Sequence, residues 1–171
     1  FGYMMPAGAE GAVAALNFAD SLIRVDLLDK AAALIETQIE RGLPAARLAG
    51  AGNKLAAVYL LNGQPQKALE ALGKTESSDA SEKETEERRL LRARAQSQLG
   101  QTDAAIAALS GLKTPAAARL RADALWRAQK WADAARAVEA MLPASAPTVL
   151  SQEEAELVLN AAVAWKLAGE A

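Results

Sequence analysis

A junction that runs from helix to turn to helix recurs along this 171-residue chain, and it restricts the fold more than any other feature. Its clearest copies contain Gly63 and Gly100, which lie 37 residues apart. Glycine suits such a junction because it adopts a positive φ without a steric clash. The repetition predicts an array of stacked helical hairpins. Two further copies lack the glycine, and all four share a small residue after the turn: Ala31, Ala68, Ala105 and Ala134.

The composition favours helices throughout. About a quarter of the residues are alanine, the best helix former, whereas only 4% are aromatic. Thr114-Pro115 is typical of an N-cap followed by the first helical residue, and Ser81–Glu84 and Ser151–Glu154 are typical capping boxes. We therefore predict an all-α fold of about nine helices, over residues 9–25, 27–42, 45–62, 65–74, 82–99, 102–111, 115–129, 131–142 and 151–168.

The missing residue types exclude several kinds of chemistry. The chain contains no histidine and no cysteine, which excludes a disulfide framework, a Cys/His zinc site and a Ser-His-Asp triad. Its 19 basic and 21 acidic residues give a net charge of −2, so we expect no binding to nucleic acid. No apolar run approaches the ~18–20 residues of a membrane-spanning helix, so we expect no direct membrane insertion. No cofactor and no metal are predicted.

The first residues carry no targeting pattern. The chain begins with Phe1, and no basic segment precedes an apolar one. We expect a soluble fragment of a longer protein, cytoplasmic or periplasmic. The abundance of alanine and arginine is typical of a bacterial source.

The spacing of small residues resembles the tetratricopeptide repeat (TPR) family, whose pairs of helices, about 34 residues long, stack into a right-handed superhelix. This family has small residues where the two helices of a pair cross. The matching first-helix positions here are Ala19, Ala56, Ala93, Ala122 and Ala162, and the second-helix positions are the four alanines named above.

The resemblance implies one superhelical domain over residues 1–171. Its units would be 9–42, 45–74, 82–111, 115–142 and an incomplete unit 151–171. Spacings of roughly 37, 37, 29 and 40 residues make the repeats degenerate. An irregular helical-hairpin solenoid of another kind is the alternative.

Two polar features have a structural and a functional interpretation. The segment Gly50–Lys54 superficially resembles a phosphate-binding loop, but it lies inside a predicted helix and lacks the required spacing. Its helix-interior glycines indicate instead a shallow pocket or a close helix contact. The charge run from Glu76 to Arg94 places acidic residues before basic ones, which complements the helix dipole. We interpret this run as a solvated face with a Glu84–Arg88 pair.

The three tryptophans fall in different registers. Trp131 and Trp165 match core positions of the family, so we predict that both are packed in the interior. Trp126 has a register that points toward the concave side, where it either forms part of an interface or packs on the neighbouring first helix.

The resemblance implies a concave groove lined by the first helices of the pairs. We predict that it binds a peptide or a helix of a partner protein, with some acidic character, and that the chain is not an enzyme. The residues implied to face the partner are Asn53, Leu60, Leu90, Arg94, Gln98, Arg119, Asp123, Trp126, Arg127 and Lys166.

A structural spacer or self-associating segment is the alternative function. The last predicted helix, 151–168, has an apolar stripe of Leu157, Ala161, Ala162 and Trp165, and no predicted second helix covers it. An uncovered stripe of this kind favours contact with a further repeat or with another copy of the chain.

Overall fold

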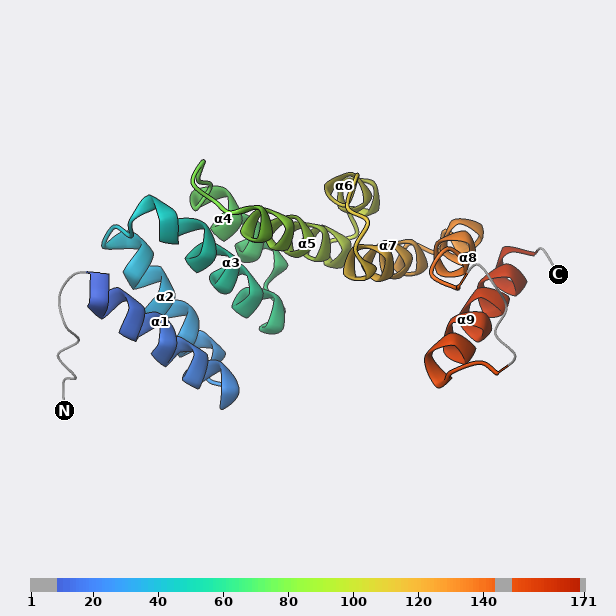
Figure 1. Ribbon diagram of the computed structural model, residues 1–171, viewed down its shortest axis with the longest axis horizontal. Coiled ribbons are helices and arrows are strands. Elements are labelled where there is room, and N and C mark those ends of the chain that lie inside the picture. Colours follow the sequence, from blue (N-terminus) through green and yellow to red (C-terminus); the bar gives the residue numbers. More distant parts are fainter. Residues whose placement is uncertain (1–8, 144–148, 170–171) are drawn as a thin grey trace. The chain divides into compact units, whose positions relative to one another are not determined.

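The computed structural model describes residues 9–143 and 149–169, and this part of the chain is all-helical (Figure 1). Each helix was predicted from the sequence to within a few residues. The nine helices in the described ranges are α1 (Ala9–Arg24), α2 (Leu28–Glu40), α3 (Ala45–Leu61), α4 (Pro65–Lys74), α5 (Glu82–Gln98), α6 (Thr102–Ala108), α7 (Pro115–Arg127), α8 (Trp131–Glu139) and α9 (Gln152–Ala168).

Capping residues were predicted from the sequence at Ser81, Thr114 and Ser151. Two of these three helix starts, those at Ser81 and Ser151, have the hydrogen bonds of a capping box. In α9 the Glu154 backbone N–H donates to Ser151 Oγ (3.2 Å), and the Ser151 N–H donates to Glu154 Oε2 (2.7 Å). Ser81 and Glu84 make the same reciprocal pair at the start of α5. Thr114 occupies the N-cap of α7 and Pro115 its first turn, but the Thr114 side chain makes no capping bond.

The turn between the two helices of a hairpin has the same geometry in four places. Backbone N–H groups reach back five residues, from Leu27 to Leu22 O, Gln64 to Tyr59 O, Gln101 to Gln96 O and Lys130 to Leu125 O, at 2.8–3.0 Å. The residue before each of these donors has a positive φ: 59° at Asp26, 67° at Gly63, 74° at Gly100 and 57° at Gln129. Glycine occupies two of the four positions, and the hydrogen bonds hold the other two residues in the left-handed conformation.

The small residues at the predicted crossings are buried, with one exception. The four second-helix alanines, Ala31, Ala68, Ala105 and Ala134, are all 0% exposed. Among the first-helix positions, Ala19, Ala56, Ala93 and Ala122 are buried, whereas Ala162 is exposed. The prediction for Ala162 is therefore wrong, because no helix of the described residues packs on that side of α9.

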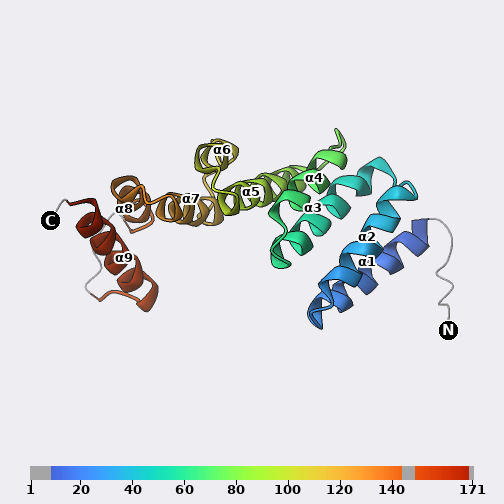
Figure 2. The same cartoon turned by 180° about the vertical axis from the view of Figure 1, so that it is seen from behind.

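The chain divides into two compact units, residues 1–95 and 96–171, with the boundary inside α5. In unit 1, α1 packs on α2, α2 on α3 and α3 on α4, and α1 and α2 lie side by side in both views (Figures 1 and 2). Its core includes the fully buried Ile35, Val58 and Leu72. In unit 2, α7 packs on α8 and α8 on α9. Ala122, Val138 and Ala161 form a small cluster there. One continuous repeat domain over the whole chain stays a prediction.

Candidate partner-binding site

The residues predicted to face a partner are divided between the two units. Unit 1 holds Asn53, Leu60, Leu90 and Arg94, and the other six belong to unit 2. Asn53 and Leu60 are only 1% and 7% exposed, so their prediction as exposed groove residues is wrong. Leu60 packs in the unit 1 core, and Asn53 is occupied by polar contacts inside the unit.

Asn53 belongs to a buried polar network that joins α3, α4 and α5. Its Nδ2 donates to Glu84 O (2.9 Å) and Glu87 Oε2 (3.3 Å), and its Oδ1 accepts from Arg88 Nη1 (2.9 Å). Arg88 Nη2 also donates to Leu72 O (2.9 Å) and to Thr75 Oγ1 (2.8 Å). The predicted solvent-exposed Glu84–Arg88 pair is therefore wrong, because Arg88 points inward and satisfies the carbonyls at the end of α4.

The two glycines of the Gly50–Lys54 segment allow this network to form. A Cβ built at Gly52 would lie 2.5 Å from Thr75 Cβ and closer still to its Oγ1, and one at Gly50 would lie 2.8 Å from Glu84 Oε1. The segment lies inside α3, as predicted. Its glycines were predicted to mark either a shallow pocket or a close helix contact, and the close contact is confirmed.

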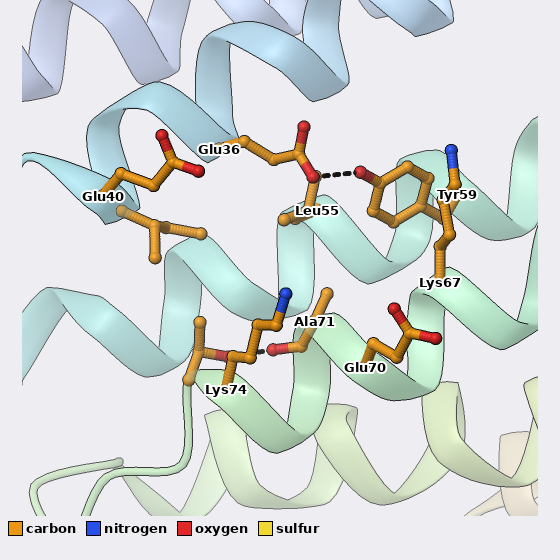
Figure 3. A pocket seen from close by; sticks show the side chains of 10 residues that line it. Glu36, Glu40, Leu55, Tyr59, Lys67, Glu70, Ala71 and Lys74 are labelled. Carbon is orange, nitrogen blue, oxygen red and sulfur yellow. Dashed lines mark hydrogen bonds between the residues drawn. The ribbon is translucent and has the colours of Figure 1, made fainter.

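A polar pocket of about 230 Å³ lies between α2, α3 and α4 (Figure 3). The Tyr59 hydroxyl donates to Glu36 Oε1, and Lys67 Nζ lies 5.5 Å from the centre of the Tyr59 ring. Burial, with the Glu36 carboxylate as a second cause, raises the pKa of Tyr59 well above its usual range. Tyr59 therefore stays a neutral phenol at physiological pH. The charged groups around it are of both signs, namely Glu36, Glu40, Glu70, Lys67 and Lys74.

In unit 2 the predicted residues of α7 share one exposed face. Arg119, Asp123 and Arg127 follow one another at intervals of four residues, and all three are exposed. Arg119 forms an ion pair with Glu153, which joins α7 to the first turn of α9. Trp126 is half-buried beside this face. Its ring meets that of Trp131 edge-on, with 5.4 Å between the centroids and an interplanar angle of 83°, so it packs on α8 of its own hairpin.

A pocket of about 200 Å³ is lined by residues of α7 and α9 together with Val138 of α8. The Trp126 ring and the small side chain of Ala122 give it apolar walls, and Asp123 and Asn160 give it polar ones. This combination of an apolar cavity and a few polar groups is typical of a place where one side chain of a ligand binds. Asn160 was not among the residues predicted to face a partner. Its position in the sequence, one residue before Ala161, does not by itself indicate that it lines a pocket.

The remaining predicted residues lie outside this pocket. Leu90 is partly buried and Arg94 exposed on α5 in unit 1, whereas Gln98, at the end of α5, and Lys166, in the last turn of α9, are exposed residues of unit 2. Their predicted contacts with a partner stay predictions.

The other two tryptophans are less buried than predicted. Trp131 and Trp165 are both partly exposed. Trp165 Nε1 donates to Glu139 Oε1 (2.6 Å), and the Arg136 guanidinium lies 5.5 Å from the Trp165 ring centre. These polar contacts keep one edge of Trp165 near the surface of α8.

The apolar residues of α9 lie on two sides of the helix. Ala161 and Ala164 are buried and Leu157 is partly buried against the unit 2 cluster. The other side exposes Val158, Leu159, Val163 and Leu167. The predicted uncovered stripe of Leu157, Ala161, Ala162 and Trp165 is therefore corrected, since only Ala162 belongs to the exposed side.

Metal sites and membrane-spanning helices are both absent from residues 9–143 and 149–169. No group of three or more acidic side chains there is placed to hold a metal ion. None of the helices in residues 9–143 and 149–169 has the length and apolar character that crossing a membrane requires. Comparison of the chain with protein-family models, with curated proteins and with solved structures finds no match. The resemblance to tetratricopeptide repeats therefore rests on the residues that carry it.

Proposed function

We propose that this chain is a non-catalytic scaffold that binds a segment of a partner protein, and that its hairpins are units of a right-handed superhelical solenoid of the TPR type. Four turns of one geometry and four fully buried second-helix alanines support the repeat. The absence of histidine and cysteine from the sequence supports a role without catalysis.

The pocket between α7 and α9 is the observation that carries the binding proposal. Its apolar walls suit one apolar side chain of an extended peptide or helix. Arg127 is exposed one residue after Trp126, with Arg119 on the same face. A carboxylate of the partner next to the apolar anchor would meet Arg127, which gives the partner its acidic character.

Selection of a displayed random-peptide library on the 171-residue chain tests this proposal. The enriched peptides are expected to combine an apolar anchor with acidic residues. Titration calorimetry of the best peptide should show a loss of affinity of roughly tenfold or more in Arg127→Glu, because a charge pair becomes a repulsion. Arg47→Glu makes the same change of charge at an exposed position of α3 in unit 1, and should leave affinity unchanged.

Two outcomes would contradict the proposal. Equal affinity of the peptide for Arg127→Glu and for the unsubstituted chain would show that the α7–α9 pocket is not the site. A folded chain that enriches no peptide would argue against peptide binding altogether.

A structural spacer or self-associating segment is the second candidate function. The exposed apolar side of α9 favours it.

A further inference from the structure

The pocket between α2, α3 and α4 combines a buried apolar lining with exposed charged groups (Figure 3). Leu55, Tyr59 and Ala71 supply the buried part and are only 4%, 6% and 5% exposed. Ile39 of α2 adds a partly buried apolar side chain. An apolar cavity with a few convergent polar groups is the usual form of a small-molecule site.

The charged side chains of this pocket are divided by sign between two helices. Glu36 and Glu40 come from α2, whereas Lys67, Glu70 and Lys74 come from α4, on the other side of the α3 residues in Figure 3. The α2 side therefore carries two negative charges, and the α4 side carries one net positive charge. None of the five forms an ion pair with a residue in the described ranges.

Tyr59 engages two of these charged groups and leaves the others open. Its hydroxyl donates to Glu36 Oε1, and Lys67 Nζ lies 5.5 Å from the centre of its ring. The side chains of Glu40 and Lys74 make no hydrogen bond within the described part of the chain. Lys74 extends from α4 into the pocket in Figure 3. The pocket thus holds a carboxylate and an ammonium group that lack partners.

The presence of both signs selects a ligand that carries both. A simple cation would be repelled by Lys74, and a simple anion would be repelled by the carboxylates of Glu36 and Glu40. A zwitterion avoids both repulsions when its positive end faces α2 and its negative end faces Lys74. The charges of the pocket therefore favour a small dipolar molecule in one orientation.

The volume of the pocket limits the size of that molecule. About 230 Å³ is less than the roughly 300–1,000 Å³ of pockets that take drug-sized ligands. It equals the share of liquid volume of about eight water molecules, at ~30 Å³ each. An α-amino acid with a branched apolar side chain, such as leucine, is of this size.

We propose that this pocket binds a free α-amino acid with an apolar side chain. The ammonium group of the ligand lies between Glu36 and Glu40, and its carboxylate lies on Lys74. Its side chain packs against Leu55 and Ala71. The pocket belongs wholly to unit 1, so this site is separate from the proposed peptide site, which is lined by α7, α8 and α9.

Titration of the isotope-labelled 171-residue chain with leucine, followed by NMR, tests this proposal. A ligand of this size makes few contacts, so we expect a dissociation constant on the order of a millimolar. Saturable shifts are expected for backbone amides of α2, α3 and α4. The amides of α7, α8 and α9 should not move with the same dissociation constant.

Two fragments of leucine separate the contributions of its charges. Isoamylamine keeps the apolar group and the ammonium group but lacks the carboxylate, and isocaproate keeps the carboxylate but lacks the ammonium group. Each should bind roughly tenfold more weakly than leucine, because one of its charge contacts is lost and one repulsion remains.

Substitutions in the pocket assign each charge to its partner. Lys74→Gln and Glu40→Gln should each weaken leucine binding roughly fivefold to tenfold. Lys74→Gln should not weaken isoamylamine, and Glu40→Gln should not weaken isocaproate. Lys83→Gln and Glu82→Gln are the matched controls, exposed on α5 outside the pocket, and should leave leucine binding unchanged. Circular dichroism should show the same fold for all four variants.

Three results would overturn the proposal. The first is the absence of a saturable shift with leucine up to about 50 mM, well above the expected dissociation constant. The second is equal affinity for isoamylamine and leucine, which would indicate a cation site. The third is equal affinity of Lys74→Gln and Lys83→Gln for leucine. None of them bears on peptide binding, which is measured with Arg127→Glu.

Discussion

Single residues of α3 and α5 determine how closely the helices of unit 1 pack. Gly52 leaves room for the Thr75 side chain, which is 1% exposed and itself donates to Ala71 O (2.7 Å). Arg88 then reaches Thr75 and Asn53 together. Burial is the largest cause that lowers the pKa of the Arg88 guanidinium, yet an arginine still stays charged at physiological pH. Its buried charge is stabilised by carbonyl, amide and hydroxyl oxygens.

We predict that Gly52→Ala destabilises the chain although alanine favours helix. The new methyl group would overlap Thr75 and force α4 and α3 apart, at a cost of about 1–3 kcal/mol or more. Gly73→Ala is the matched control, because it lies in α4 with open space around its Cα. That substitution should stabilise the chain by about 0.5–1 kcal/mol. Urea unfolding followed by circular dichroism measures both changes, and equal effects of the two would refute the close contact.

Sequence reasoning predicted the small buried residues better than the polar ones. Ala31, Ala68, Ala105 and Ala134 could be found because a repeated spacing marks them. The burial of Arg88 and Asn53 could not be predicted in this way. Arg88 lies in a run of charged residues, and Asn53 lies at a position assigned to a solvent-exposed helix face, so the local sequence favours exposure for both. Their burial depends on groups 35 residues apart meeting in space, which no local pattern records.

At the scale of elements, helix ends follow local chemistry and were predictable for that reason. The capping boxes at Ser81 and Ser151 formed as expected. The turns at Gly63 and Gly100 were also found from the sequence. At the matching positions of the other two turns, Asp26 and Gln129 adopt the same left-handed conformation although neither is a glycine. Only their place in the repeat could have predicted this conformation. The exposed side of α9 was assigned to the wrong residues, because both sides of that helix are apolar.

Acidification should weaken the start of α5. Hydrogen bonds from Ser81 lower the pKa of Glu84 below its ordinary value of 4.5. A carboxylate with a lowered folded-state pKa contributes stability that is present above that ordinary value and is lost as pH falls through the folded-state pKa. We predict that Glu84→Gln lowers the melting temperature at pH 7 and that this difference shrinks as the pH falls below 4.5.

The control for this prediction is Glu82→Gln, an exposed carboxylate in the same first turn. It should change the melting temperature little at either pH. Melting curves at pH 7, 5 and 3 compare the two variants, and a deficit of Glu84→Gln that is as large at pH 3 as at pH 7 would contradict the assigned role of the carboxylate.

At the scale of the whole molecule, the two units can be observed separately. All three tryptophans, Trp126, Trp131 and Trp165, belong to unit 2. Their fluorescence therefore reports on unit 2, whereas circular dichroism reports on helices of both units. Repeat arrays in which each unit mainly contacts its neighbours need not unfold in one step.

We predict that Gly52→Ala moves the early part of the circular dichroism transition to lower urea and leaves the tryptophan transition in place. Ala134→Leu, which overpacks a 0% exposed position of α8, should instead shift the fluorescence midpoint. If Gly52→Ala shifts both signals by the same amount, the units unfold as one and the prediction fails.

The four identical turns lie 37, 37 and 29 residues apart, so the unequal lengths must be absorbed elsewhere in each hairpin unit. They are absorbed in the second helix, the loop after it and the first helix that follows, since α6 has seven residues where α4 has ten, and α7 has 13 where α5 has 17. Insertions and deletions are therefore tolerated after each second helix. They are not expected within the six residues from Tyr59 to Gln64 or in the matching residues of the other turns, because the five-residue hydrogen bond fixes the length there. A designer who wishes to lengthen the array or to insert a foreign segment should use the loop after a second helix, for example residues 76–80 between α4 and α5.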